Sequence, residues 1–343
     1  MNGYQRIMAA FRGERPDSIP VMLHNFMMAA REAGVSMEEF RRDPDKLARC
    51  FIEAVEKYRY DGIVIDVDTV TLAGAAGVPV DFPHDEPARI SGRRINDLSE
   101  IGELPSVDIR LNQRVLVWLE AVAILKRHFQ DEILIRGNCD QCPFTLAGMI
   151  RGMDDWMTDL LEPDREELVH RLLEYGADLT HQFIRLMAAT GAHMISNGDS
   201  TAGPELVSPR IYRRFALPYE QRIAGFAHEL GLPYVLHICG NTDAIITDMM
   251  ATGSDALELD YKTDIALAHE NMKDRTVFVG NIDPSGVLAL GTPQQVEAAT
   301  RNLLNTFSDT PRFVLNAGCA IPPNTPPENL RAMVRTARTF TAD

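Results

Sequence analysis

The fold is inferred most directly from Leu232-Pro233-Tyr234-Val235-Leu236-His237-Ile238-Cys239-Gly240-Asn241, a short apolar run that ends in polar side chains. In a β-strand, residues two apart face the same side, so His237 and Cys239 would project together at the end of this strand. A neighbouring imidazole and thiol favour metal binding. A second apolar run, Phe313-Val314-Leu315, precedes Cys319 and would place another thiol at a similar strand end. The two strand ends can meet only in a suitable fold.

Apolar runs of this kind alternate with helical patterns along the whole chain. Together with the run that carries His237, the runs are 19–23, 62–68, 133–137, 194–199, 256–260, 276–281 and 312–316, which makes eight. Helices are expected at 4–14, 43–58, 113–129, through 143–187, and at 208–230, 243–252 and 293–307, with an elaborated loop at 73–112. Strict alternation implies a parallel sheet, and eight units favour a closed (β/α)8 TIM barrel over a doubly wound open sheet. We therefore predict one barrel domain over residues 1–343, with an N-terminal helical extension.

The amino-acid composition indicates which kinds of partner the protein does not bind. The chain has 343 residues and a formal net charge of −15, without a basic block, which argues against nucleic acid or an anionic membrane as partner. The N-terminus lacks an apolar signal core, and no apolar run approaches the roughly 20 residues that span a bilayer. We expect a cytoplasmic protein whose five cysteines are reduced thiols with metal or catalytic roles.

Polar side chains follow the predicted strands at the ends where barrel enzymes build their sites. They are Asp66, Asp68, Asn197, Asp199, His237, Cys239, Asp260, Asn281 and Cys319. A His/Cys/Cys set suits Zn²⁺, and three protein ligands leave a fourth position that a carboxylate could occupy until substrate displaces it. We predict His237, Cys239, Cys319 and Asp260 as the metal ligands, with Glu258 as the alternative to Asp260.

The charge of these ligands indicates the reaction. Two thiolates neutralise the formal charge of Zn²⁺, so the metal polarises a carbonyl weakly but still deprotonates a bound thiol. The site therefore suits thiol alkylation better than hydrolysis. Asp199 and Asp260 are the predicted catalytic carboxylates, and Asn197 and Asn281 the predicted cofactor-binding residues.

Several of the polar residues and cysteines have more than one possible role. Asp66, Asp68 and Asp199 could act as general acids or bases, or could cap helices and pair with arginines. Cys139 and Cys142 form a C-x-x-C without a second copy, which favours packing or a lining role over redox chemistry. Neither a G-x-G-x-x-G nor a Walker pattern is present, so a dinucleotide or phosphate-bearing cofactor has no support.

The chain resembles the uroporphyrinogen decarboxylase superfamily over nearly its whole length. The resemblance is carried by the N-terminal helix with Arg15-Pro16-Asp17-Ser18-Ile19-Pro20-Val21, by Gly280-Asn281-Ile282-Asp283-Pro284, and by residues 322–330. Within it, His237-Ile238-Cys239-Gly240-Asn241 and Cys319 resemble the zinc-ligand pattern of the cobamide-dependent branch, the methylcobamide:coenzyme M methyltransferases.

This resemblance implies a zinc methyltransferase that moves a methyl group from a corrinoid carried on a small partner protein to a thiol such as coenzyme M. It maps the acidic fourth ligand best onto Asp260. The acceptor could instead be another molecule such as tetrahydrofolate. Two further alternatives are a metal-independent tetrapyrrole decarboxylase and a corrinoid-binding component with a structural zinc. Decarboxylation is less favoured because Leu23-His24-Asn25-Phe26-Met27-Met28 replaces the arginine-bearing stretch of the decarboxylases.

Overall fold

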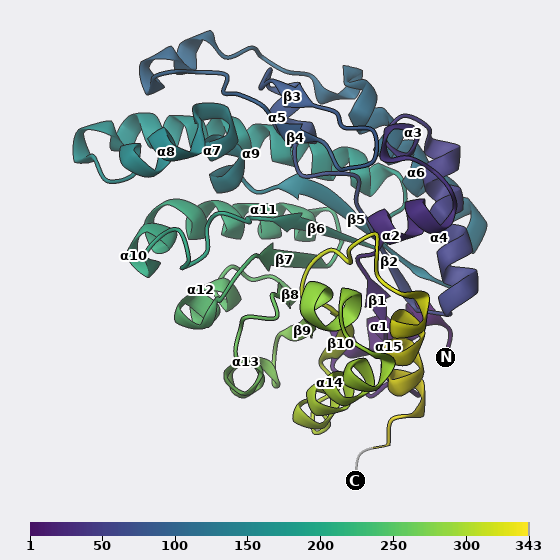
Figure 1. Ribbon diagram of the computed structural model, residues 1–343. Helices are drawn as coiled ribbons and strands as arrows, with labels where there is room; N and C mark the ends of the chain where they lie inside the picture. The colour runs from purple at the N-terminus through teal and green to yellow at the C-terminus, as the bar shows by residue number, and fades with distance from the viewer. Residues whose placement is uncertain (342–343) are drawn as a thin grey trace.

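Eight parallel strands close into a barrel in the computed structural model, which describes residues 1–341 (Figure 1). Neighbouring strands follow one another in chain order around the sheet. The first and last strands also pair, because Val21 bridges Leu315 in parallel and the Leu315 amide donates to the Pro20 carbonyl at 2.9 Å. The predicted (β/α)8 barrel is confirmed.

The strands of the barrel begin and end close to the apolar runs of the sequence. They are β1 (Met22–Leu23), β2 (Gly62–Ile65), β5 (Leu134–Gln141), β6 (Met194–Gly198), β7 (Tyr234–Ile238), β8 (Ala256–Leu259), β9 (Val277–Ile282) and β10 (Phe313–Ala317). The expected elaborated loop holds an antiparallel pair, β3 (Val80–Asp81) and β4 (Arg89–Ile90), and two 3-10 turns at 98–103 and 109–111.

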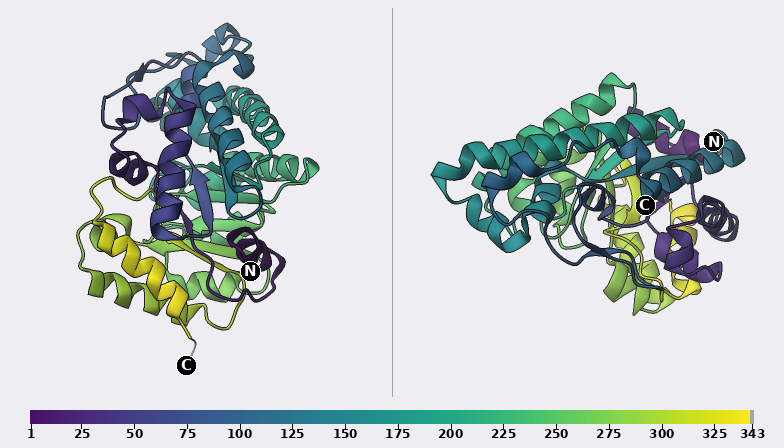
Figure 2. Two further views of the ribbon diagram at one scale, coloured as in Figure 1. Left: turned by 90° about the vertical axis from the view of Figure 1, so that its right-hand side faces the viewer. Right: turned by 90° about the horizontal axis from the view of Figure 1, so that it is seen from above.

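Helices surround the strands, as Figures 1 and 2 show from three directions. They are α1 (Gly3–Arg12), α2 (Phe26–Glu32), α3 (Met37–Phe40), α4 (Pro44–Tyr58), α5 (Thr71–Ala75), α6 (Gln113–Phe129), α7 (Pro143–Arg151), α8 (Met153–Asp159), α9 (Glu166–Ala189), α10 (Pro209–Ile211), α11 (Leu217–Glu229), α12 (Ile246–Met250), α13 (Ile265–Met272), α14 (Pro293–Thr306) and α15 (Pro327–Thr339). Among these residues, no helix is long and apolar enough to span a bilayer.

Local sequence explains the helix boundaries. Asp43 caps α4 by accepting from the amides of Asp45 and Lys46, with Pro44 in the first turn, as its sequence predicts. The segment 143–187, for which helices were predicted, contains α7, α8 and most of α9. Gly152, with φ 90°, separates α7 from α8 because few other residues adopt that conformation. Helices α2, α5, α13 and α15 were not predicted, and α5 lies where the expected loop at 73–112 begins.

The lower half of the barrel is an apolar plug. Inward-facing side chains of every strand, among them Met22, Val64 and Val235, form one buried cluster together with Ile7 and Ala10 of α1. The N-terminal helical extension therefore closes the bottom of the barrel. Because side chains alternate along each strand, the next inward position lies one layer higher, and there the residues become polar.

Candidate metal centre

A cavity of about 290 Å³ lies above the apolar plug, at the carboxyl ends of the strands. Its wall includes side chains from seven stretches that follow or end different strands. The polar and sulfur-bearing ones are His24, Met27, Asp66, Asp68, Thr69, Arg136, Asn138, Gln141, Asn197, Ser200, His237, Cys239, Glu258 and Cys319. The position matches that of active sites in barrel enzymes.

Three of these residues form the one group of potential metal ligands among the described residues. The ligand atoms of His237, Cys239 and Cys319 all lie within 4.8 Å of one another, and the three residues are partly exposed. His237 is the last but one residue of β7, Cys239 directly follows that strand, and Cys319 lies in the loop after β10. Barrel closure thus brings the two strand ends of the sequence analysis together.

The imidazole of His237 is held with one nitrogen directed at the thiols. Its Nδ1 lies 2.9 Å from the backbone carbonyl of Glu258, and because a carbonyl only accepts, Nδ1 carries the proton. Its Nε2 lies 3.3 Å from the Sγ of Cys239. A metal-binding histidine is commonly fixed by such a hydrogen bond from its other nitrogen to a carbonyl.

The electrostatics of the three groups favour charge separation within the site. A hydrogen bond from Cys319 and the charge of the neighbouring His237 lower the pKa of the Cys239 thiol to about 3, although burial alone would raise it. Burial alone would lower the pKa of His237, but Cys239 and Glu258 raise it to about 10. The pKa of Cys319 rises well above its usual value, because it donates to Cys239 and is buried. Without a metal, the site therefore holds a thiolate between an imidazolium and a thiol.

This donor set fits zinc. Metal distances of about 2.3 Å to sulfur and about 2.0–2.1 Å to nitrogen imply tetrahedral edges of roughly 3.5–3.8 Å between ligand atoms. The 3.3 Å separation of His237 and Cys239 is close to that edge. A cation at this point would replace the protons that the three groups now share.

The structure does not bring Asp260 into this group. One of its oxygens accepts the Gly240 amide at 2.9 Å and the other the Lys262 amide at 3.0 Å. Its carboxylate thereby fixes the turn after Cys239. Glu258 lines the cavity, but its oxygens pair with Arg136 and with the Asn316 amide at 2.7 Å. Neither carboxylate is a fourth ligand in this geometry.

The prediction of Asp199 as a catalytic residue is not supported by its placement. Asp199 is fully buried, accepts the Thr145 amide at 2.8 Å and is not part of the cavity wall. It follows the end of β6, and its side chain turns toward α7 rather than into the barrel. Burial raises the pKa of Asp199 to about 6 beside the buried Glu220.

The two predicted cofactor-binding asparagines hold the protein backbone. Asn197 lines the cavity, but its amide nitrogen donates to the Cys139 carbonyl at 2.6 Å and its oxygen accepts the Tyr234 hydroxyl at 3.3 Å. Asn281 lies outside the cavity wall and donates to the Asp260 carbonyl at 3.0 Å. Their placement favours positioning of the strand ends over binding of a cofactor.

Arg136 and His24 are cavity residues that sequence reasoning did not assign to the site. The guanidinium of Arg136 is 2% exposed and pairs with the equally buried carboxylate of Glu258. The signal was present in the sequence, because a charge inside the apolar run 133–137 must face the lumen and find a partner there. The pair lies in the same layer of inward-facing side chains as His237, directly above the apolar plug.

The C-x-x-C segment packs behind the cavity. The Cys142 sulfur lies 3.4 Å from the Tyr234 hydroxyl, and the Cys139 sulfur lies 3.9 Å from the Gly137 carbonyl. Both residues are fully buried, and burial raises the pKa of both thiols well above the usual value. The structure favours the packing role, since a reactive cysteine needs a low pKa and exposure.

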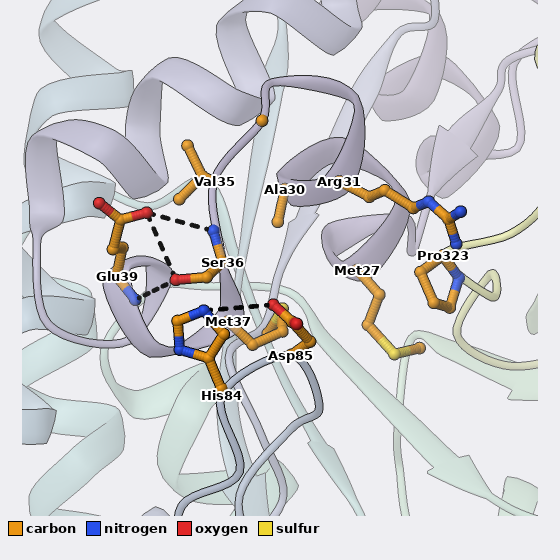
Figure 3. A pocket seen from close by; sticks show the side chains of 11 residues that line it. Met27, Ala30, Arg31, Val35, Ser36, Met37, Glu39, His84, Asp85 and Pro323 are labelled. Carbon is orange, nitrogen blue, oxygen red and sulfur yellow. Dashed lines mark hydrogen bonds and ion pairs between the residues drawn. The ribbon is translucent and has the colours of Figure 1, made fainter.

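A second, larger pocket of about 580 Å³ opens beside α2 and α3 (Figure 3). Met27 is part of both walls, so the two cavities are neighbours. The charged and hydroxyl side chains in its wall are Arg31, Ser36, Glu39, His84 and Asp85, and Figure 3 shows the contacts of Ser36 with Glu39 and of His84 with Asp85. It contains no metal-ligand group among the described residues, and we therefore place the chemistry in the smaller cavity.

The family of the chain follows from comparison with known proteins. The family model described as uroporphyrinogen decarboxylase (URO-D) matches residues 2–340, and the chain belongs to this family. The methylcobamide:CoM methyltransferase MtbA of Methanosarcina mazei is 29% identical to it, with 98% of this chain and 97% of that protein covered. MtaA of Methanosarcina barkeri, also named a methylcobamide:CoM methyltransferase, is 26% identical, with coverages of 96% and 95%.

Two further proteins are similar to the chain over nearly its whole length. The uroporphyrinogen decarboxylase of Alkalilimnicola ehrlichii is 28% identical, with 96% of this chain and 92% of that protein covered. A solved structure of a methyltransferase from Methanosarcina mazei superposes with a TM-score of 0.87, at 24% identity and 98% coverage of each chain. The latter similarity shows a shared fold. The resemblance inferred from the sequence motifs is confirmed.

Proposed function

We propose that the protein is a zinc-dependent methyltransferase that moves a methyl group from a methylated corrinoid to a small thiol. The observation that carries the proposal is the convergence of His237, Cys239 and Cys319 within 4.8 Å at the mouth of the barrel. The names of the relatives MtbA and MtaA support the reaction class.

The residues of the chain have defined roles in this mechanism. His237, Cys239 and Cys319 would hold the zinc, which lowers the pKa of an incoming thiol and so makes it nucleophilic near neutral pH. Glu258 fixes the imidazole through its carbonyl, and Arg136 fixes Glu258. The cavity walls align the thiol for displacement at the methyl carbon, with a corrinoid-carrying protein as the proposed donor.

Decarboxylation of a tetrapyrrole is the alternative within the same family. Such a substrate carries several carboxylates and calls for several cationic side chains. Among the described residues of the cavity wall, Arg136 is the sole arginine or lysine, and Glu258 already pairs with it. The cavity therefore favours the thiol reaction.

The test combines metal analysis with X-ray absorption on the purified protein, with and without coenzyme M. We expect one zinc per chain, with a coordination shell that gains one sulfur when the thiol is added. Cys319→Ala should lose the zinc, whereas Cys142→Ala, a matched change at a buried cysteine outside the group, should keep it. Absence of zinc from the intact protein, or a shell that coenzyme M leaves unchanged, would contradict the proposal.

A further inference from the structure

A histidine and an aspartate on the cavity wall form a hydrogen-bonded pair that the proposed chemistry has not yet used. The Nε2 of His24 lies 2.8 Å from Oδ2 of Asp66. The two side chains are 13% and 4% exposed, and both line the cavity that holds the metal-ligand candidates. Asp66 is itself fixed, because its other oxygen accepts the Val67 amide at 2.8 Å.

The backbone of His24 is tied to the segment that carries Cys319. Its amide donates to the side chain of Asn316 at 3.2 Å, and its carbonyl accepts the amide of Ile321 at 2.8 Å. These bonds lie on either side of Cys319 in sequence. The end of β1 is thereby held against the loop that supplies one of the thiolates.

The second ring nitrogen of His24 is open to the cavity. A carboxylate accepts, so Asp66 selects the form of the neutral ring with its proton on Nε2 and a lone pair on Nδ1. Among the described residues, Nδ1 has no hydrogen-bond partner, and it is not one of the buried unpaired atoms. A base oriented by a carboxylate, with its lone pair free in a reaction cavity, is built to accept a proton.

We propose that His24 is the proton acceptor for the methyl-acceptor thiol, with Asp66 as its positioning residue. This inference rests on the proposed function. The S–H bond breaks, its electron pair stays on sulfur and its proton moves to Nδ1 of His24. Asp66 stabilises the resulting imidazolium, which later returns the proton to water. The thiolate then forms the S–C bond as the carbon–cobalt bond breaks, with that electron pair left on cobalt.

The surrounding charges leave Asp66 free for this task. The charged and titratable groups around the pair are Asp68, Asp140, Arg136, Glu258, Cys239, His237 and Cys319. Glu258 is paired with Arg136, and Asp68 is paired with Arg114. Burial and the charge of Asp68 raise the pKa of Asp140 to about 8, which keeps it neutral at pH 7. Asp66 is thus the carboxylate dedicated to His24.

The first test counts protons rather than turnovers. Coenzyme M is titrated calorimetrically at pH 7 into the zinc-loaded protein in two buffers of different ionisation enthalpy. We expect the wild type to release well under one proton per thiol bound, because His24 retains it. His24→Gln should release a full proton to the buffer, and Asp66→Asn should move in the same direction.

The second test compares the rates of two thiols, one of which needs no base to lose its proton. Methyl transfer from free methylcobalamin to coenzyme M should fall about 10²-fold in His24→Gln at pH 7, the usual size of a general-base contribution. With 4-nitrothiophenol, which is already ionised at pH 7, the same variant should approach wild-type rates. His228→Gln is the matched control, because His228 forms a similar pair with Asp255 at 2.8 Å on the surface.

The outcomes separate this inference from the proposed function. If the wild type binds coenzyme M and transfers methyl groups, but His24→Gln releases no additional proton and slows both thiols equally, the role of His24 is refuted and the methyltransferase stands. If the wild type neither binds coenzyme M nor methylates it, both fail. Should His24→Gln fold poorly, Asp66→Asn, which retains the imidazole, decides by the same proton count.

Discussion

Replacement of Arg136 by methionine should destabilise the protein strongly at neutral pH. The change removes the guanidinium from a pair in which both side chains are 2% exposed, and leaves Glu258 ionised in the floor of the cavity. Removal of one partner of a buried pair costs about 3–5 kcal/mol. A hydrogen bond from Asn316 at 2.7 Å remains, but it carries no compensating charge.

The pKa of Glu258 gives an independent magnitude. Burial opposes ionisation, but Arg136 and the nearby histidines lower the pKa from 4.5 to about 2. At about 1.4 kcal/mol per pKa unit, ionised Glu258 contributes about 3 kcal/mol to the free energy of unfolding. Because the folded-state pKa lies below the unfolded one, this contribution is complete above pH 4.5 and is lost as the pH falls toward 2.

The assay is urea unfolding of the metal-free protein, followed by circular dichroism at pH 7 and pH 4. Arg136→Met should lose about 3–5 kcal/mol at pH 7, and the difference from wild type should narrow at pH 4. Adding Glu258→Gln to it should recover part of the loss. Arg12→Met, at an exposed ion pair, should change stability by less than about 1 kcal/mol. A loss below about 1 kcal/mol for Arg136→Met, or one independent of pH, would refute the reasoning.

Three further outcomes follow from the site. In the metal-free protein, iodoacetamide should modify Cys239 even at pH 5, because the pKa of the Cys239 thiol is lowered to about 3. Cys139 and Cys142 are fully buried and should react only after unfolding. Mass spectrometry of the labelled peptides checks both results. Asp199→Asn should keep methyl transfer close to the wild-type rate in a methylcobalamin assay, because Asp199 is not part of the cavity wall. Its stability relative to wild type should rise between pH 4 and pH 7, because burial raises the pKa of Asp199 to about 6 and charging it costs folding energy. Asp260→Asn should keep stoichiometric zinc by metal analysis, since the Asp260 oxygens hold backbone amides rather than the ligand group.

The barrel and the three ligand candidates could be predicted because both follow from local periodicity. Eight apolar runs alternate with helices, and residues two apart on a strand share a face, so His237 and Cys239 had to project together. Parallel closure then determines that the loop with Cys319 reaches the same rim. These inferences need only the order of the strands and the alternation of side chains.

The carboxylates could not be assigned in the same way. Asp199 and Asp260 come just after the last residues of β6 and β8, where the alternation of a strand no longer fixes the direction of a side chain. Their directions depend on which amides lie nearby, such as Thr145 for Asp199 and Gly240 for Asp260. Such contacts arise from tertiary packing, which a single sequence does not display.

The pairing of Val21 with Leu315 has a consequence for synthesis on the ribosome. The seam of the barrel pairs residue 21 with residue 315, so it can form only after both have left the exit tunnel. Until then the first strand has an unpaired edge, and the apolar plug lacks the Val314 that completes it. Nascent chains stalled before residue 313 should therefore be protease-sensitive and recruit chaperones, and release of a few dozen more residues should abolish both.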